Sequence, residues 1–345
     1  MKKVTILGAG IGGISAGIFL LKKGIDVELI EGSRALSVKT CGEFLSYEAI
    51  ELLRELDITP KKEIKETIFH YEERSFLRKM PLPCASMPRL ELETALLQKF
   101  HALGGTIVFG HKVEKIVSNS YFQLYLDNGE KIEAKEVIFS TGRFQGMASL
   151  ENLPYQGIKN HYMMENPPDA LNMVFFPDGY LGFSPIDHNK SVLSCLVKQK
   201  EIKIEKLLKI YPLDKYLKNQ EPLFQNWLTT PVGPFGCKKL PPWANSYFVG
   251  DAAATIPPIS GQGMTISLIS GQMVAEYVVN GRYEEYRKMW KKRFYKRIAL
   301  SSMLHAAALS PKVAPKLFYF LMKNPRWIDT FFYLTRDTIY REQQA

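Results

Sequence analysis

The spacing of apolar and polar residues predicts a strand, a helix and a second strand at the start of the chain. Residues 3–8 (KVTILG) are a short, mostly β-branched apolar run, typical of a buried strand. The small and apolar residues of 12–23 predict a helix that ends at Gly24. Residues 26–31 (DVELIE) predict the next strand. Strand, helix and strand within about 30 residues have the size of one βαβ unit of a parallel sheet.

The middle of the chain is predicted to consist mostly of strands. Apolar residues at helical spacing predict helices over 46–56 and 88–103, separated by irregular strands over 64–82. Residues 105–140 and 157–198 predict strands throughout. Asp127-Asn128-Gly129 is a strong signal for a turn between two of these strands.

Helices dominate the prediction for the last third of the chain. A charged helix is expected at 201–219, extended structure from 227, a buried strand at 246–250 and a helix over 261–280. After residue 283 the chain is predicted to be helical, with interruptions at Pro311, Pro315 and Pro325.

Strands suited to a parallel sheet therefore lie at both ends of the chain, around a mostly antiparallel middle. The predicted fold is α/β: a discontinuous Rossmann-like nucleotide-binding domain, an inserted antiparallel β-sheet substrate domain and a helical C-terminal region. The expected boundaries are 1–75, 88–145 and 245–282 for the nucleotide-binding domain, 76–87 and 146–244 for the substrate domain, and 283–345 for the helical region.

Composition is that of a folded globular protein. The chain has 345 residues, of which 46% are hydrophobic and 23% charged, so a sizeable core is expected and disorder is not. The net charge of +10 favours anionic partners. Part of the excess lies in residues 282–297 (RYEEYRKMWKKRFYKR), but no nucleic-acid-binding motif accompanies it, so nucleic acid is not an expected partner.

Four cysteines and six histidines narrow the chemistry. Cys41, Cys84, Cys195 and Cys237 form no C-x-x-C pair, so a dithiol redox centre is not predicted and a reducing, cytoplasmic setting is the simplest inference. The histidines have no metal-ligand spacing and are interpreted as surface or core residues, so no metal is expected.

The first motif with chemical content is a glycine-rich loop between the first strand and the first helix. Gly8-Ala9-Gly10-Ile11-Gly12-Gly13 matches G-x-G-x-x-G. In that pattern Gly8 allows the tight turn, Gly10 lets the backbone approach a pyrophosphate, and Gly13 lets the helix pack on the strand. Glu31, at the end of the second strand, is placed to accept the adenosine ribose hydroxyls and would repel a 2′-phosphate. The loop alone does not separate FAD from NAD.

A second motif near the end of the chain favours FAD. Residues 246–264 (SYFVGDAAATIPPISGQGM) place a short strand, Gly250-Asp251, a Pro-Pro turn and a helix start in succession. This resembles the second FAD fingerprint of the aromatic hydroxylase and geranylgeranyl reductase superfamily, whose fold is named after p-hydroxybenzoate hydroxylase. The resemblance implies that Asp251 binds the ribityl chain and that the helix beginning near Gly261 and Gly263 faces the flavin pyrimidine, where its positive end stabilises reduced flavin.

Four further segments bear on this resemblance, which covers roughly residues 1–280, and one of them departs from the family pattern. Arg89, in RLELETALL, resembles the arginine that lies near the FAD phosphates in the family. Thr141-Gly142 stands where the hydroxylases usually have Asp-Gly, which puts hydroxylase-style use of NADPH in doubt. KTCGEFLS (39–46) resembles a Cys-Gly segment that passes near the isoalloxazine, so Cys41 and Gly42 are candidate cofactor contacts and Cys41 a candidate catalytic thiol. GYLGFSPID (179–187) resembles a strand that lines the substrate pocket.

The leading functional hypothesis is an FAD-dependent oxidoreductase that reduces a double bond of a hydrophobic isoprenoid, lipid or polyketide-like substrate. Flavin-dependent hydroxylation is the alternative; a NAD-dependent dehydrogenase and a flavin-binding protein without turnover are more distant ones. The chain has no second G-x-G-x-x-G motif after a strand and no W-x-W-x-I-P segment of flavin halogenases, so the electron donor, NAD(P)H or a reduced carrier, is left open. Residues 282–337, basic and then aromatic, predict either packing on the substrate domain or peripheral contact with a membrane, at its inner face.

Overall fold

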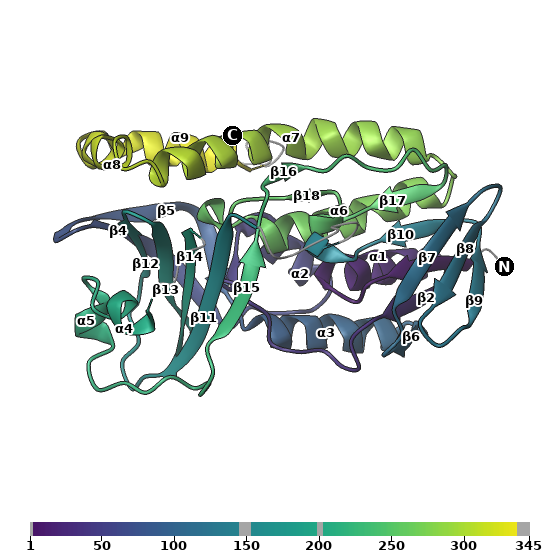
Figure 1. Ribbon diagram of the computed structural model, residues 1–345, viewed down its shortest axis with the longest axis horizontal. Coiled ribbons are helices and arrows are strands. Elements are labelled where there is room, and N and C mark those ends of the chain that lie inside the picture. The colour runs from purple at the N-terminus through teal and green to yellow at the C-terminus, as the bar shows by residue number, and fades with distance from the viewer. Residues whose placement is uncertain (1–2, 145–152, 199–202, 337–345) are drawn as a thin grey trace.

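The structure is a computed structural model that describes residues 3–144, 153–198 and 203–336. Two large sheets lie side by side, and three helices from the end of the chain run along one side of both (Figure 1). The α/β fold predicted from the sequence is confirmed.

The first sheet is parallel and is assembled from distant parts of the chain. Its strand order is β17 (Ser246–Phe248), β10 (Val137–Phe139), β1 (Lys3–Leu7), β2 (Asp26–Glu31) and β6 (Thr106–Phe109). All three residues of β10 and of β17 are buried, as expected of strands that are covered on both faces. The strand that follows residue 245 therefore joins the same sheet as the strand at residue 3.

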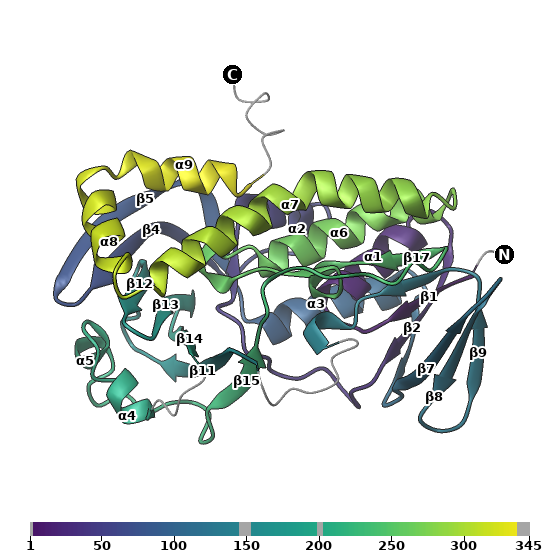
Figure 2. The ribbon, with the colours of Figure 1, turned by 45° about the horizontal axis from the view of Figure 1, so that its top comes forward.

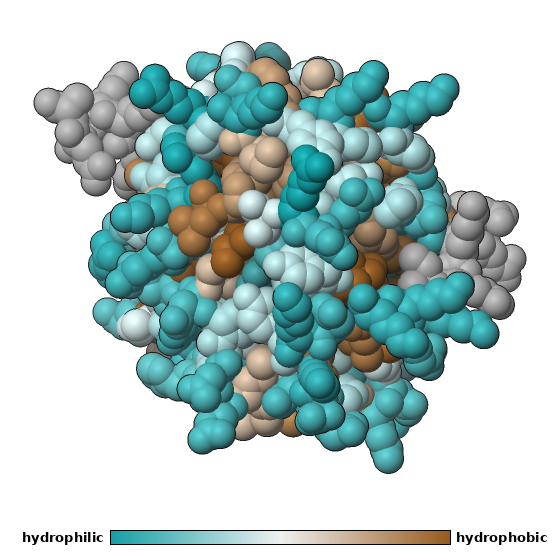
Figure 3. Space-filling view, turned by 90° about the vertical axis from the view of Figure 1, so that its left-hand side faces the viewer, coloured by the Kyte–Doolittle hydropathy of each residue, from teal (hydrophilic) through white to brown (hydrophobic). Residues whose placement is uncertain are grey.

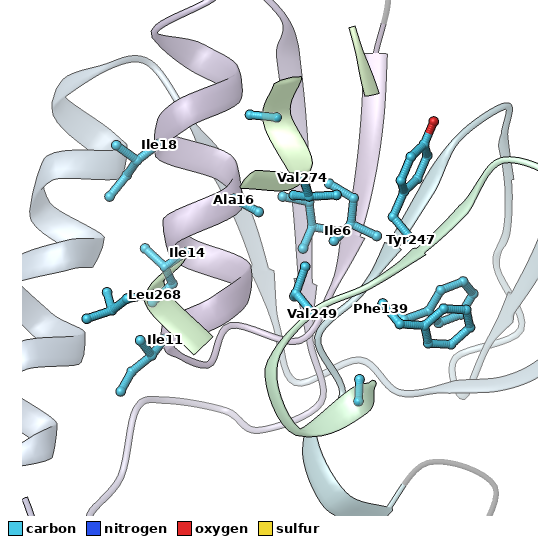
Figure 4. Close-up of a cluster of buried hydrophobic side chains, with 14 of the residues drawn as sticks. Ile6, Ile11, Ile14, Ala16, Ile18, Phe139, Tyr247, Val249, Leu268 and Val274 are labelled. Carbon is cyan, nitrogen blue, oxygen red and sulfur yellow. The ribbon is translucent and has the colours of Figure 1, made fainter. Parts of the chain in front are cut away.

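Helices and a small sheet cover this parallel sheet. The helices are α1 (Ile11–Leu21), α2 (Tyr47–Arg54), α3 (Arg89–Ala102) and α6 (Gly263–Val278). Figure 4 shows Ile14 of α1 and Leu268 of α6 in the same apolar core as Ile6 of β1. A Cβ on Gly271 of α6 would lie 2.6 Å from the carbonyl oxygen of Gly12, so α1 and α6 pack backbone against backbone. The small sheet contains β7 (Val113–Ser118), β8 (Phe122–Leu126) and β9 (Lys131–Ala134).

The second sheet has eight strands and is antiparallel except between β12 and β4. Its order is β15 (Leu228–Val232), β11 (Tyr155–Met163), β14 (Lys190–Lys198), β13 (Gly179–Asp187), β12 (Leu171–Phe176), β4 (Lys62–Tyr71), β5 (Arg74–Ser86) and β3 (Phe44–Leu45). Because β4 pairs with β12, we now propose that the substrate domain begins near Lys62 rather than at residue 76.

The C-terminal helices are α7 (Tyr283–Ala308), α8 (Ala314–Lys323) and α9 (Arg326–Leu334). In Figure 2, α7 passes over α6, and α8 and α9 lie over β4 and β5. Arg78 of β5 forms a two-bond ion pair with Asp329 of α9, which fixes the helix to the sheet. No helix among the described residues is long and apolar enough to cross a membrane.

The remaining short elements complete the description. They are α4 (Ile204–Leu207), α5 (Leu213–Tyr216), β16 (Gly236–Cys237), β18 (Ala254–Thr255) and the 3-10 turns η1 (Gly142–Phe144), η2 (Gly250–Ala252) and η3 (Pro258–Ser260).

Three predictions of elements were wrong in detail. The continuous helix expected at 201–219 is two single turns, α4 and α5, separated around Pro212, whose ring cannot continue a helix; its first two residues lie outside the described part. The strands expected to be irregular over 64–82 form one long hairpin, β4–β5. Pro315 does not interrupt a helix but lies in the first turn of α8, where its missing N–H costs nothing.

Candidate functional site

One cavity of about 1270 Å³ lies between the two sheets and the C-terminal helices. Every candidate cofactor residue from the sequence lines it except Gly13: Gly8, Gly10, Glu31, Cys41, Gly42, Arg89, Thr141, Gly142, Gly250, Asp251, Gly261 and Gly263. These residues come from six separate stretches of the chain, so the fold brings together what the motifs predicted separately.

The glycine loop has the geometry that its motif predicts. Gly8 has φ +101°, and a Cβ there would lie 2.4 Å from the carbonyl oxygen of Ser140. A Cβ on Gly13 would lie 2.0 Å from the carbonyl oxygen of Gly8, so Gly13 serves the packing of α1 on β1. A Cβ on Gly10 would meet nothing within 4 Å. The space in front of Gly10 is therefore open and belongs to the cavity.

Glu31 is held at the edge of this loop by backbone hydrogen bonds. Its carboxylate accepts the N–H of Ala9 at 2.7 Å and the N–H of Ser33 at 2.9 Å. Each oxygen can accept a further bond. The carboxylate is thus oriented toward the cavity, beside the start of α1.

Asp251 lies in the electrostatic field of three cations. Burial raises the pKa of Asp251, and the charges of Arg143, Arg89 and Lys238 oppose that rise. Lys238 is fixed by hydrogen bonds to the carbonyls of Gly142 at 3.0 Å and Arg143 at 2.9 Å. The Asp251 carboxylate accepts no hydrogen bond from any residue of 3–144, 153–198 or 203–336. It is available to a hydroxyl group of a bound molecule, in a field that attracts phosphate. Sequence reasoning found Arg89 but missed Arg143 and Lys238.

The start of α6 closes this half of the site. Gly261 has φ +64°, and a Cβ there would lie 2.6 Å from the ring of Phe44. Gly263 is the first residue of α6, so its N-terminal N–H groups and positive partial charge lie at the cavity wall.

The Cys41 segment is held by a buried charged network that the sequence did not reveal. The Cys41 sulfur accepts the N–H of Glu43 at 3.3 Å. Glu43 has φ +57° and is 1% exposed; its carboxylate binds Lys159 and, at 2.8 Å, Nε2 of His161. Burial alone would raise the pKa of Glu43, but the hydrogen bond with His161 and the charge of Lys159 outweigh it and lower the pKa.

The sequence contained a weak signal for this network. Lys159 and His161 are alternate residues of β11, so they face the same side of the sheet. A Lys-x-His pair inside a buried strand requires a partner anion, but nothing in the spacing identifies Glu43, more than a hundred residues earlier.

The other half of the cavity is apolar and aromatic. The eight-stranded sheet contributes Phe69, Phe76 and Phe175, and the C-terminal helices contribute Leu317, Phe318 and Phe332. Tyr180 of β13 lines the cavity between the halves, and its hydroxyl lies 3.2 Å from Nδ1 of His305. Burial lowers the pKa of His305 to about 4, so the imidazole is neutral at physiological pH. The expectation that 179–187 lies at the pocket agrees with this placement.

The residues of the first half fit FAD. Gly10 leaves room for a pyrophosphate, Glu31 is oriented for ribose hydroxyls, and Asp251 has an uncommitted carboxylate. Arg143 and Lys238, together with Arg89, which is also ion-paired with Glu93 at 2.9 Å, would supply positive charge for the phosphates. The cavity continues beyond these residues, so a second molecule has room beside the cofactor.

Comparison with known proteins agrees with this fit. Residues 1–123 match the family described as FAD binding domain. The menaquinone reductase of Mycolicibacterium smegmatis is 20% identical over 83% of this chain and 78% of its own length. Kynurenine 3-monooxygenase of Legionella pneumophila is 23% identical over 84% of this chain and 77% of its own length.

Solved structures share the fold at low sequence identity. A geranylgeranyl bacteriochlorophyll reductase-like protein of Thermoplasma acidophilum has a TM-score of 0.75, with 20% identity over 93% of this chain and 92% of its own. The flavin-dependent brominase Bmp2 also has a TM-score of 0.75, with 17% identity over 96% and 92% of the two chains. Because residues 1–123 match an FAD binding domain, the cofactor of the first motif is FAD rather than NAD. The chain is an FAD-dependent oxidoreductase: its first 123 residues match an FAD binding domain, and its fold is shared with these flavoproteins.

Proposed function

We propose that this enzyme reduces a carbon–carbon double bond of a hydrophobic substrate of the isoprenoid, lipid or polyketide-like class. The observation that carries the proposal is the apolar half of the cavity, which is continuous with the FAD half. Aromatic side chains from both the sheet and the C-terminal helices face this space. A long apolar molecule would gain about 25 cal/mol for each Å² of apolar surface that it buries there.

The chain's own residues would hold the substrate and supply a proton. When bound, FAD supplies the hydride that a double-bond reduction requires. A proton must reach the neighbouring carbon, and the Cys41 thiol and the Tyr180 hydroxyl are among the proton-bearing side chains that line the cavity. We assign the catalytic role to Cys41, because the buried network around Glu43 fixes its segment against β11. We also propose that the twelve cavity-lining residues predicted from the sequence bind the cofactor.

Hydroxylation is the second candidate function. Kynurenine 3-monooxygenase, a relative by sequence, is named for that chemistry. Thr141-Gly142, in place of the Asp-Gly typical of hydroxylases, favours reduction, and so does the likeness to a protein named menaquinone reductase. The electron donor is proposed to be NAD(P)H or a reduced carrier protein.

We further propose that the C-terminal helices contact the surface of a membrane. Phe320 and Trp327 are 46% and 51% exposed and pack on each other at the turn from α8 to α9. Figure 3 views the end of the molecule that carries α8, where hydrophobic patches lie among hydrophilic side chains. Exposed lysines accompany these residues, so the surface combines apolar and cationic groups. A hydrophobic substrate would then enter the cavity from the lipid phase.

An anaerobic single-turnover experiment tests the proposed reaction. Holoprotein reduced with one equivalent of dithionite is mixed with geranylgeraniol, whose double bonds are its only electron acceptors, and flavin absorbance is followed. We expect reoxidation without oxygen and a product heavier by two hydrogen atoms, both much slower in Cys41→Ala protein. Reoxidation only in air, with one oxygen atom gained, would overturn reduction in favour of hydroxylation.

A further inference from the structure

Arg336 is a buried cation at the apolar end of the cavity, and the proposed reaction leaves it without a role. It follows α9, is 7% exposed and lines the cavity. Its guanidinium lies 3.5 Å from the centre of the Phe332 ring. It donates hydrogen bonds to the carbonyl of Phe332 at 3.1 Å, the hydroxyl of Thr335 at 2.9 Å and the carbonyl of Ser260 at 3.2 Å.

These contacts leave part of the guanidinium unused. Arginine has five N–H donors, and the three acceptors here are neutral. Nε has no hydrogen-bond partner among the described residues. The Nε–H and one Nη2–H therefore have no acceptor among the described residues, and these two nitrogens are neighbours on the guanidinium. Adjacent N–H groups of this kind are the donors with which arginine binds a carboxylate or a phosphate.

The charge of Arg336 is also uncompensated within the described part of the chain. The acidic side chains that interact electrostatically with the Arg336 guanidinium are those of Cys84, Glu48 and Tyr47, and Glu48 is the one carboxylate among them. Glu48 is already bound to Arg297 at 2.9 Å, and both side chains are almost fully buried. The charges of Glu48 and Arg297 cancel each other, so Arg336 leaves this buried region with a net positive charge. Burial lowers the pKa of Arg336 to about 10, which still leaves it protonated at neutral pH.

The position of this charge relates it to the reaction site. Ser260, which accepts a hydrogen bond from Arg336, ends the turn η3 immediately before Gly261 and α6. Phe332, Thr335 and Ile328 line the cavity around it. An anion bound to Arg336 would therefore lie next to the loop that forms the flavin half of the site, with apolar surface on its other sides.

We propose that Arg336 binds the anionic group, a carboxylate or a phosphate, of an otherwise hydrophobic substrate. This inference rests on the proposed function and makes it more specific: the substrate is an acidic amphiphile rather than a neutral lipid. The apolar part lies against the aromatic residues of α8 and β4, and the charged group selects the orientation in which the molecule enters. Arg336 is a residue of specificity, since it need not touch the reacting atoms.

A matched set of ligands tests the proposal on the holoprotein. The probes are geranylgeranoic acid, geranylgeranyl monophosphate and geranylgeraniol, which differ only at the head group. Binding is measured from the change in flavin absorbance on titration, with flavin occupancy and melting temperature recorded for each protein. Wild-type protein should bind at least one of the two anions about tenfold more tightly than the alcohol. The anion that is preferred identifies the head group.

Variants then assign the preference to Arg336. Arg336→Met, which keeps an unbranched apolar stem and removes the guanidinium, should lose the preference for the anion and keep the affinity for the alcohol. Arg336→Lys should retain part of the preference. If the alcohol binds wild-type protein as tightly as both anions, or if Arg336→Met weakens all three ligands equally, this inference fails while the proposed function stands. If none of the three binds, both fail. The wild-type comparison decides the outcome even if the variants do not fold.

Discussion

At the scale of single residues, Gly10 is a glycine of the site that packing does not require, and the space in front of it is unfilled. Gly8 and Gly13 are required by the protein itself, because a Cβ at either would collide with backbone. A Cβ at Gly10 would meet nothing within 4 Å. Packing does not explain the absence of a side chain there, whereas the cofactor that we propose would need that space, which makes Gly10 the most selective test of the proposed cofactor site.

We expect Gly10→Val to abolish or strongly weaken FAD binding while leaving the fold intact. The added branches would occupy the space that the pyrophosphate needs, and we expect the affinity to fall on the order of tenfold or more, about 1.4 kcal/mol. Flavin content of the purified protein and titration of the apoprotein with FAD measure the effect. Ala306→Val, on the exposed side of α7, is the matched control. Normal flavin content in Gly10→Val would contradict the assignment.

Residue by residue, the sequence predicted those parts of the site that are local in the chain. Gly8, Gly10 and Glu31 lie within one βαβ unit, where the spacing of residues determines their geometry. Arg143 and Lys238 approach Asp251 from separate loops, so no spacing reports their proximity. Arg336 was included only in a segment predicted to pack or to bind membrane, since a buried cation in a C-terminal helical region is indistinguishable in sequence from a surface one.

At the scale of secondary structure, the connection between the Cys41 segment and β11 is the feature that couples the two halves of the site. Thr40 bonds to Thr230 of β15 at 2.8 Å, and Lys159 donates to the carbonyl of Lys39 at 3.2 Å as well as binding Glu43. The Cys41 segment is therefore attached to the eight-stranded sheet by buried and partly buried polar contacts. Such contacts are costly when incomplete, so their loss should affect stability as well as position.

We expect Glu43→Gln to destabilise the protein by on the order of 3 kcal/mol at neutral pH, since Lys159 is left buried without an anion. The double variant Glu43→Gln with Lys159→Met should be less destabilised than Glu43→Gln alone, because the uncompensated charge is gone. Denaturant unfolding of the holoproteins measures both. An equal or larger loss in the double variant would contradict the buried-pair explanation.

The same network predicts the sign of a pH dependence. The folded-state pKa of Glu43 is lowered, so its contribution to stability is present above the ordinary glutamate pKa of about 4.3 and is lost as the pH falls through the folded value. The difference in unfolding free energy between wild type and Glu43→Gln should therefore be constant from neutral pH to about pH 5 and shrink only in more acidic solution.

Elements with a strong period were predicted well, and those that depend on distant partners were not. The helices α1, α3 and α6 were expected within two residues of their observed ends. The sequence predicts irregular strands for the hairpin β4–β5, because its regularity comes from pairing with β12 and from α8, which covers its aromatic side chains Phe69, Phe76 and Tyr71.

At the scale of the whole molecule, the two ends of the chain complete one cavity. The N-terminal loop and the α6 loop form the FAD half, and α8 and α9 return over β4 and β5 to enclose the apolar half (Figure 2). The C-terminal helices thus perform the packing role that was one of their two predicted roles. Their inner faces line the cavity, while Phe320, Trp327 and the lysines of α7 lie on the outside. Packing uses the inner faces of these helices and the proposed membrane contact uses their outer faces, so the helices can serve both roles.

The outer face predicts salt-sensitive binding to anionic vesicles. Each basic residue near such a surface adds on the order of 1 kcal/mol, an attraction that salt screens over about 10 Å at 0.1 M. Truncation of these helices would open the cavity, so point variants are the better test. The four exposed lysines of α7 are replaced together with glutamine: Lys288, Lys291, Lys292 and Lys296.

Co-sedimentation of the full-length holoprotein with vesicles of phosphatidylcholine alone, or mixed with phosphatidylglycerol, measures the effect. We expect binding to the anionic vesicles at low salt, a marked loss in the α7 variant and a smaller loss in Trp327→Ala, whose exposed ring would enter the interface. The matched control removes four exposed lysines elsewhere: Lys115, Lys131, Lys135 and Lys218. If this control loses binding as fully as the α7 variant, the attraction is a property of the net charge of +10 and not of the C-terminal helices. If wild-type protein does not bind at low salt, the helices serve only to enclose the cavity, and the substrate must reach it from solution.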